Sequence, residues 1–285
     1  MESIPYLIHA LSSIHVGRGS DPGVIDLPIA RMKATGIPFL PGSSIKGVLR
    51  AALDDDKDTK RLNAVFGSPA RDPEMTAGAL VVGDARLLVL PVRSFRGTFF
   101  WVTSPLLLAL AKRDLSRPQM SVPSPKVGSA VVASEAEAHL NNSKLYLEDI
   151  DLDANVGDLQ EWTSIANALF PEKDIFSKRF AVVHDDVMDF LWQTGTQVDA
   201  RIRINAETRT ADKGALWLEE SLPAETLLLG LLSAERTRSS IEMQPHEVLN
   251  YALAGERHLQ FGGKASTGRG RCRMLKLEVK GGASV

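Results

Sequence analysis

Prolines and glycines divide residues 24–50, VIDLPIARMKATGIPFLPGSSIKGVLR, and this segment constrains the fold of the chain most. Gly36-Ile37-Pro38 and Pro41-Gly42 are turn signals, and the residue before a proline is biased away from helical backbone. A helical pattern begins only after the second turn, so we expect a helix over residues 44–53. The segment therefore predicts a constrained loop that leads directly into the N-terminus of a helix.

The start of that helix has the composition of a phosphate-binding site. Ser43 and Ser44 stand at its beginning, and Lys46 and Arg50 add positive charge. The free N–H groups at a helix N-terminus and the helix dipole both favour an anion. Upstream on the constrained loop, Asp26 is an isolated acid in an apolar run. A lone aspartate of this kind is more often a turn or cap residue than a catalyst, although this one could act on whatever carries the phosphate.

Short apolar runs alternate with helical patterns along the chain, and this order indicates an α+β fold. We expect strands at residues 6–12, 79–90, 98–103 and 271–279, and helices at 58–66, 105–113, 158–169 and 245–253. Residues 116–129 hold three prolines, which predicts an exposed excursion. Residues 197–205 and 214–220 flank a polar turn, and they predict a β-hairpin with a long polar tip.

A glycine-rich loop, residues 262–270 with the sequence GGKASTGRG, lies between two predicted strands. Glycines let the backbone approach a ligand closely, and successive N–H groups can hold phosphates. A dinucleotide motif would follow an early strand and open a helix, and a P-loop would end in Gly-Lys-Ser/Thr. Neither arrangement occurs here, which leaves a flexible hairpin turn or a phosphate contact. The candidate contacts are Gly262, Gly263, Lys264, Ser266, Thr267 and Arg269.

Composition and charge bound the class of protein. A simple nucleic-acid binder would be basic, whereas this chain of 285 residues has a net charge of −2. Residues 257–280 are nevertheless rich in Lys and Arg, with Glu278 as their one acid, so a local basic surface is compatible with the overall charge. No apolar run approaches the ~20 residues of a membrane span, and the N-terminus lacks a signal-peptide pattern. Cys272 is the one cysteine, which excludes an internal disulfide. We expect a cytoplasmic protein.

Islands of sequence from end to end resemble the RAMP superfamily of CRISPR proteins. Within that superfamily, the similarity is to the backbone nuclease subunits of type III-B Cmr effector complexes. The islands are residues 6–12, 15–17, 24–50, 89–94, 101–105, 183–186, 214–220 and 260–270, whereas residues 115–158 match least clearly.

The resemblance implies one RAMP domain over residues 1–285: a ferredoxin-like (RRM-like) palm with an inserted fingers region and a thumb β-hairpin at about 197–220. It also implies a backbone subunit that binds guide RNA and cleaves complementary target RNA at regular intervals. The partners would be the CRISPR guide RNA, the target RNA, other Cmr subunits, and copies of the same chain in a helical row. Base pairing would recognise the target sequence, and the protein would recognise the RNA backbone and shape.

The resemblance also assigns site residues. Asp26 occupies the position of the family's cleavage aspartate, where it would hold a divalent ion, Mg²⁺ or Mn²⁺, or act in proton transfer. His15 is a second catalytic candidate, and a structural loop histidine is at least as good an interpretation. The glycine loop and the helix start, with Ser43, Ser44, Lys46 and Arg50, become contacts to the RNA backbone.

Alternatives stay open at this point. The chain could be a type III-A backbone nuclease subunit or a structural RNA-binding subunit with a silent site. A nuclease that matures the guide precursor is a third alternative, and it would be expected to have a clearer His-based acid–base pair than this sequence shows. His184-Asp185-Asp186 resembles part of a metal site, but without further ligands it predicts a helix start. Trp217 on the hairpin either packs beneath it or stacks on a base, and packing is the better interpretation.

Overall fold

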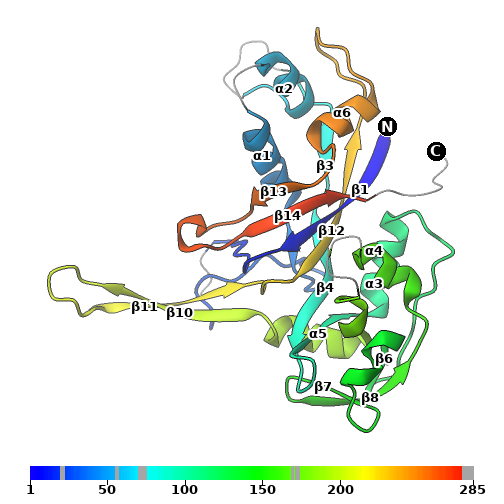
Figure 1. Cartoon of the computed structure of the whole chain (residues 1–285). Helices are drawn as coiled ribbons and strands as arrows, with labels where there is room; N and C mark the ends of the chain where they lie inside the picture. The colour runs from blue at the N-terminus through cyan, green and yellow to red at the C-terminus, as the bar shows by residue number, and fades with distance from the viewer. Residues whose placement is uncertain (20–22, 55–57, 70–75, 168–169, 171–173, 278–285) are drawn as a thin grey trace.

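A long β-hairpin projects from a mixed α+β body in the computed structural model (Figure 1). The structure describes residues 1–19, 23–54, 58–69, 76–167, 170 and 174–277. Within these ranges, no helix is long and apolar enough to cross a membrane.

One large mixed sheet runs through the body. Its strand order is β13-β14-β1-β12-β4-β5-β9-β6-β8-β7, and β2 and β3 pair at its side with β4 and β12. Neighbouring strands are antiparallel except for the pairs β5–β9 and β6–β8. The strands are β1 (Glu2–Ala10), β2 (Phe39–Leu40), β3 (Leu80–Val82), β4 (Ala85–Arg93), β5 (Phe99–Thr103), β6 (Ser129–Val132), β7 (Lys144–Leu147), β8 (Ile150–Val156), β9 (Phe180–Val183), β12 (Leu227–Ala234), β13 (Arg257–Gln260) and β14 (Arg271–Lys276).

The two faces of the sheet belong to two hydrophobic clusters. Side chains alternate across a strand, so Tyr6 and Ile8 of β1 pack into one cluster and Leu7 packs into the other. Helices α1 (Gly42–Leu53), α2 (Thr59–Phe66), α5 (Asp185–Thr194) and α6 (Pro245–Ala252) contribute to the first cluster. Helix α4 (Gln160–Asn167) contributes to the second, and α3 (Pro105–Asp114) contributes to both. Burial of both faces fixes the register of these strands.

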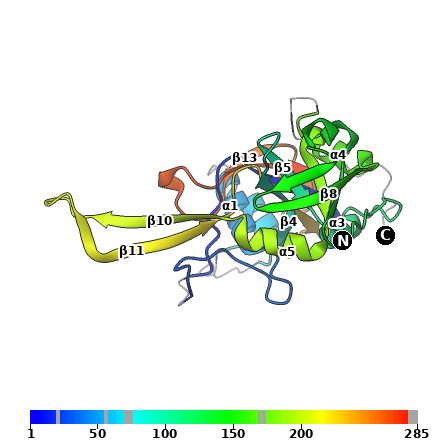
Figure 2. The same cartoon turned by 90° about the horizontal axis from the view of Figure 1, so that it is seen from below.

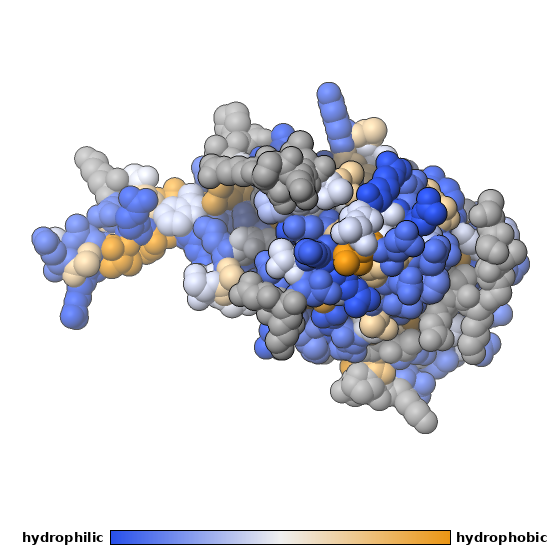
Figure 3. Space-filling model, turned by 90° about the horizontal axis from the view of Figure 1, so that it is seen from above, coloured by the Kyte–Doolittle hydropathy of each residue, from blue (hydrophilic) through white to orange (hydrophobic). Residues whose placement is uncertain are grey.

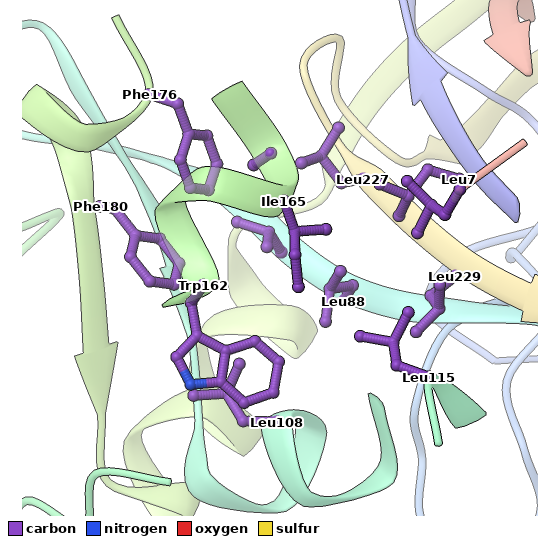
Figure 4. Close-up of a pocket in the computed structure, with 13 residues that line it drawn as sticks. Leu7, Leu88, Leu108, Leu115, Trp162, Ile165, Phe176, Phe180, Leu227 and Leu229 are labelled. Atoms are coloured by element: carbon purple, nitrogen blue, oxygen red, sulfur yellow. The ribbon is translucent and has the colours of Figure 1, made fainter. Parts of the chain in front are cut away.

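The second cluster encloses a small apolar cavity, which Figure 4 shows in close-up. Its described lining residues are aliphatic or aromatic, and the indole N–H of Trp162 donates to the carbonyl of Ser121 at 2.7 Å. Because the wall offers no convergent polar groups, we interpret this cavity as a packing defect of the core.

The expected elements are largely confirmed, with instructive exceptions. Helix α1 begins at Gly42 rather than residue 44, because Pro41 is its N-cap and the two serines lie in its first turn. The strand expected at 79–90 is two strands, interrupted at Gly83 and Asp84. The excursion expected at 116–129 is not fully exposed, since Met120 is buried in the second cluster. The ends of two expected elements, at 168–169 and 278–279, lie outside the described residues.

The projecting hairpin, β10 (Gln197–Ile204) and β11 (Ala211–Ser221), confirms the hairpin expected at 197–220. Its two faces differ in character. One face carries apolar side chains that are exposed to solvent, and Figure 3 shows them as a band along the hairpin: Val198 (44%), Ile202 (52%), Ile204 (53%) and Leu216 (66%). The opposite face carries Asp199, Arg201, Trp217 and Glu219, so the hairpin is amphipathic along its length.

Candidate active site and nucleic-acid interface

The loop that carries Asp26 is fixed to the base of the hairpin. Leu27 forms a parallel bridge with Glu219 of β11, in which Leu27 N–H donates to Leu218 O at 3.1 Å and Glu220 N–H donates to Leu27 O at 3.0 Å. The carboxylate of Asp26 is exposed, and its Oδ2 accepts a hydrogen bond from the backbone N–H of Leu218 at 2.8 Å. The loop is therefore joined to the hairpin by one β-bridge, and it holds a solvent-accessible acid at the edge of β11. Figure 2 shows the hairpin, β10 and β11, projecting from the body.

The buried carboxylate of Glu220 bonds to the same loop. The Glu220 side chain is 3% exposed, and its Oε1 accepts hydrogen bonds from Arg31 Nη2 at 2.5 Å and from Thr196 Oγ1 at 2.9 Å. Its Oε2 accepts from the backbone N–H of Ile29 at 2.9 Å. A buried charge with one partner removed is strongly destabilising, so this network makes the path of residues 27–31 specific.

His15 lies along the same edge of β11 as the Asp26 loop, at Glu220. Its ring is 6% exposed, and Nδ1 is 2.6 Å from the carbonyl oxygen of Glu220. Because a carbonyl can only accept, Nδ1 must be the donor. His15 and Asp26 thus contact β11 two residues apart, at Glu220 and Leu218, which is about 6.6 Å along a strand. His15 is therefore held against β11 in the isolated chain, and the catalytic role expected from the sequence stays a prediction.

The glycine loop packs against the segment that carries His15. Gly263 N–H donates to His15 O at 3.0 Å. Gly262 has φ +76°, and a Cβ atom there would lie 2.3 Å from His15 O, so no other residue fits this approach. Glycine at this position is therefore required by a backbone contact within the protein. Gly262, Gly263, Ser266 and Thr267 are themselves exposed, and both Figure 1 and Figure 2 show the loop projecting on the same side as the hairpin.

Lys264 joins the glycine loop to the hairpin. Its Nζ is 2.8 Å from Glu219 Oε1, which also accepts from the indole N–H of Trp217 at 2.8 Å, and Arg201 Nε lies 3.5 Å from Glu219 Oε2. Burial by itself would raise the pKa of Glu219. The hydrogen bonds from Lys264 and Trp217, with the charges of Lys264 and Arg201, outweigh it and lower the pKa from 4.5 to about 2. Glu219 is therefore ionised at neutral pH, and it binds the loop and the hairpin together.

Arg269 bonds within the protein in the isolated chain. Its side chain is 5% exposed, and its guanidinium binds the Asp199 carboxylate and the Ser221 hydroxyl. These donors are directed at the protein, and the RNA contact expected for Arg269 stays a prediction. Arg269 is a second link between the glycine loop and the hairpin base.

The start of helix α1 is also engaged within the protein. Lys46 Nζ donates to Leu80 O at 3.2 Å, and Arg50 donates to Asn63 Oδ1 at 2.8 Å and to Gly67 O. Burial, with a further contribution from the charge of Arg50, lowers the pKa of Lys46. Ser43 and Ser44 remain exposed. The Gly42 N–H at the helix start donates to the carboxylate of Asp84 at 2.8 Å, which weakens the case for a bound anion.

The tertiary structure brings together Asp26, His15 and the glycine loop through β11, whereas Lys46 and Arg50 of α1 bond elsewhere, to Leu80, Asn63 and Gly67. In the described part of the chain, no group of three or more His, Cys, Asp and Glu side chains lies close enough to hold a metal ion. Sequence reasoning missed Asp199, Glu219 and Glu220, although two of them lie within the island at 214–220. The signal that could have identified them is their position, since all three are acids near the base of the predicted hairpin. His184 is the N-cap of α5, with Asp185 and Asp186 in the first turn, as expected.

Comparison with known proteins assigns the family. A sequence model of the RAMP superfamily matches residues 7–273. A Pyrococcus furiosus protein named CRISPR system Cmr endoribonuclease Cmr4 is 35% identical over 95% of each chain. This chain belongs to the RAMP superfamily, in the Cmr4 family.

Solved structures of the family share this fold. Oligomeric Cmr4 from Pyrococcus furiosus matches with a TM-score of 0.73 at 26% identity, over 98% of this chain and 99% of that one. A chain of a type III-B Cmr-β complex, solved with cognate target RNA, matches with a TM-score of 0.75 at 23% identity, over 98% of both chains. The Cmr4 fold is thus a mixed α+β fold with one large, mostly antiparallel sheet and a projecting hairpin in this member.

Proposed function

We propose that this chain is a guide-RNA-binding backbone subunit of a type III-B CRISPR (Cmr) effector complex, and that it cleaves complementary target RNA at regular intervals. The relative that spans 95% of the chain is named a Cmr endoribonuclease. A type III-A backbone subunit is the less favoured assignment, because that full-length relative belongs to a Cmr system. Other Cmr subunits, the guide, the target and further copies of the chain would be its partners.

In this proposal the body is a ferredoxin-like palm with a fingers insertion, forming a single domain over residues 1–285, and β10–β11 is the thumb. The exposed apolar face of the hairpin supports a role outside the body, because an isolated chain leaves that face uncovered. In a row of copies, the apolar face of each hairpin would be covered either by the neighbouring copy or by the guide–target duplex. Lys264 and the exposed Gly262, Gly263, Ser266 and Thr267 would follow the RNA backbone, with Ser43 and Ser44 as further contacts.

Cleavage would use the 2′-OH of the target as nucleophile. Stacking in an A-form duplex holds that hydroxyl out of line with the adjacent phosphorus, so a strand must be distorted before it can be cut. A hairpin wedged into the duplex supplies the distortion, and positioning of this kind accounts for much of the acceleration in such reactions. Asp26 would accept the proton of the hydroxyl or orient the group that does.

A divalent ion, Mg²⁺ or Mn²⁺, would fit the site only with RNA as co-ligand. Asp26 Oδ2 is engaged by Leu218 N–H, which leaves one carboxylate oxygen directed at solvent, and Mg²⁺ is typically bound by one or two carboxylates together with substrate phosphates and water. When bound, the ion would supply charge stabilisation at the phosphate. His15 would hold the geometry of β11 and the glycine loop.

The exposed carboxylate of Asp26, fixed at the base of the hairpin, is the observation that carries the catalytic part of the proposal. Asp26→Asn tests it, because Asn keeps an acceptor for Leu218 N–H and removes the charge. In the assembled complex with guide and labelled complementary RNA, we expect cleavage to be lost while guide and target binding persist. Unchanged cleavage would leave the structural RNA-binding subunit as the better assignment, and joint loss of binding and cleavage would make Asp26 a structural residue.

A further inference from the structure

The loop that carries Asp26 borders a hollow of mixed polar and apolar character. Its volume is about 410 Å³, within the ~300–1,000 Å³ of typical small-molecule sites. The loop lines it from both sides of the acid, with Ile25 before Asp26 and Pro28 after it. The other described lining residues are Arg18, Gly23, Val24, Ile29, Arg31, Gly36, Gln193 and Glu220. A phosphodiester linkage held at Asp26 would therefore lie at the rim of this hollow.

The lining has the mixed chemistry that a nucleobase requires. Ile25, Pro28 and Ile29 offer apolar surface for the face of a base. Gln193, at the end of α5, donates from its amide nitrogen to Asp189 Oδ2 at 2.9 Å, and its second N–H and its oxygen can bond to the polar edge of a base. A base combines a flat apolar face with such an edge, and proteins that bind single strands use both.

The floor of the hollow is an ion pair. Glu220 is buried there, and its negative charge is paired with Arg31 at 2.5 Å. Arg18 also lines the hollow, and its positive charge can contact the phosphate that carries a bound base. Val24 at the mouth is 90% exposed, so its side chain is available to cover a ribose or the outer face of a base.

We propose that this hollow receives the nucleobase of the target nucleotide that the hairpin displaces. The inference rests on the proposed function, since it requires a target strand distorted beside Asp26. A displaced base loses its stacking partners, and a site that accepts it makes the distorted strand more favourable. The hollow would thereby hold the linkage next to Asp26 in the conformation that is cut.

Filling the hollow tests the proposal. Gln193 is exposed on α5, so Gln193→Trp occupies the space without disturbing the core. The matched control is Gln160→Trp, on an exposed position of α4. In assembled complexes, we expect Gln193→Trp to lower the rate of target cleavage about tenfold, which corresponds to about 1.4 kcal/mol, while the control cleaves at the wild-type rate. Val24→Ser should show a smaller loss of the same kind.

A target RNA with an abasic residue at the displaced position identifies the occupant. The wild-type complex should cleave it about tenfold more slowly than the intact target, and Gln193→Trp should then make no further difference. Unchanged cleavage of the intact target by Gln193→Trp, with the variant folded by thermal melting, would overturn the proposal. It would also be overturned if an abasic residue in the guide, rather than in the target, removed the effect of the variant. Absence of cleavage by the wild-type complex would instead overturn the proposed function on which the inference rests.

Discussion

Glu219→Gln isolates the charge that joins the glycine loop to the hairpin. Gln keeps the shape of the side chain and an acceptor for the indole N–H of Trp217, but it removes the ion pair with Lys264. The pKa of Glu219 falls from 4.5 to about 2 on folding. At about 1.4 kcal/mol for each pH unit, this corresponds to about 3 kcal/mol of stability at neutral pH. The Glu219 side chain is 3% exposed, but those of Lys264 and Arg201 are 36% and 40% exposed, so solvent screening makes about 3 kcal/mol an upper value.

The sign of this contribution sets its pH dependence. A carboxylate with a lowered pKa in the folded state stabilises the protein above the pKa of the unfolded chain, and the contribution disappears as the pH falls through the folded pKa. The window for Glu219 is therefore pH 4.5 down to about 2. We expect the difference in unfolding free energy between wild type and Glu219→Gln to be at most about 3 kcal/mol at pH 7 and at most about 2 kcal/mol at pH 3.5.

Thermal melting of both proteins between pH 7 and 3.5 measures this difference. For a chain of this size, the upper value of about 3 kcal/mol corresponds to a melting temperature lowered by roughly 6 °C at pH 7. Glu207→Gln, an exposed glutamate at the hairpin tip, is the control and should leave the melting temperature unchanged at each pH. Equal melting temperatures of wild type and Glu219→Gln at pH 7, or a difference that does not shrink below pH 4.5, would refute the reasoning.

Further predictions concern the RNA interface and the hairpin. Lys264→Ala should weaken guide binding and reduce the slope of log affinity against log salt by about one, measured in titrations at several salt concentrations. Arg269→Ala should lower the melting temperature and leave that slope unchanged, because the arginine is buried against Asp199; a reduced slope would confirm the RNA contact expected from the sequence. Deletion of residues 207–213 should leave the melting temperature unchanged and reduce target cleavage, since a polar hairpin tip adds little to the core. A deletion variant that still cuts at the same regular positions would contradict the wedge mechanism.

The helices and strands could be predicted from the sequence where proline and glycine turn signals agreed with the spacing of the apolar residues. Pro41 and the apolar spacing after it define α1 to within two residues, and the polar turn between two alternating runs defines the hairpin. Strand β12 lies at the centre of the sheet, between β1 and β4, and was missed. Its sequence, LLLGLLSA, is a continuous apolar run, and such a run does not distinguish a buried strand from a helix.

For the site, the sequence by itself determined which residues lie on the glycine loop, on the Asp26 loop and on the hairpin, because glycine, proline and alternation act locally. Only the tertiary structure decided what each of them faces. Lys264 and Arg269 are five residues apart and equally basic in sequence, yet the second is buried against Asp199 while the first lies at the surface beside Glu219. Asp26 meets Leu218 across 192 positions of chain. Contacts of that kind depend on how the whole sheet orders its strands, and no local pattern of residues encodes them.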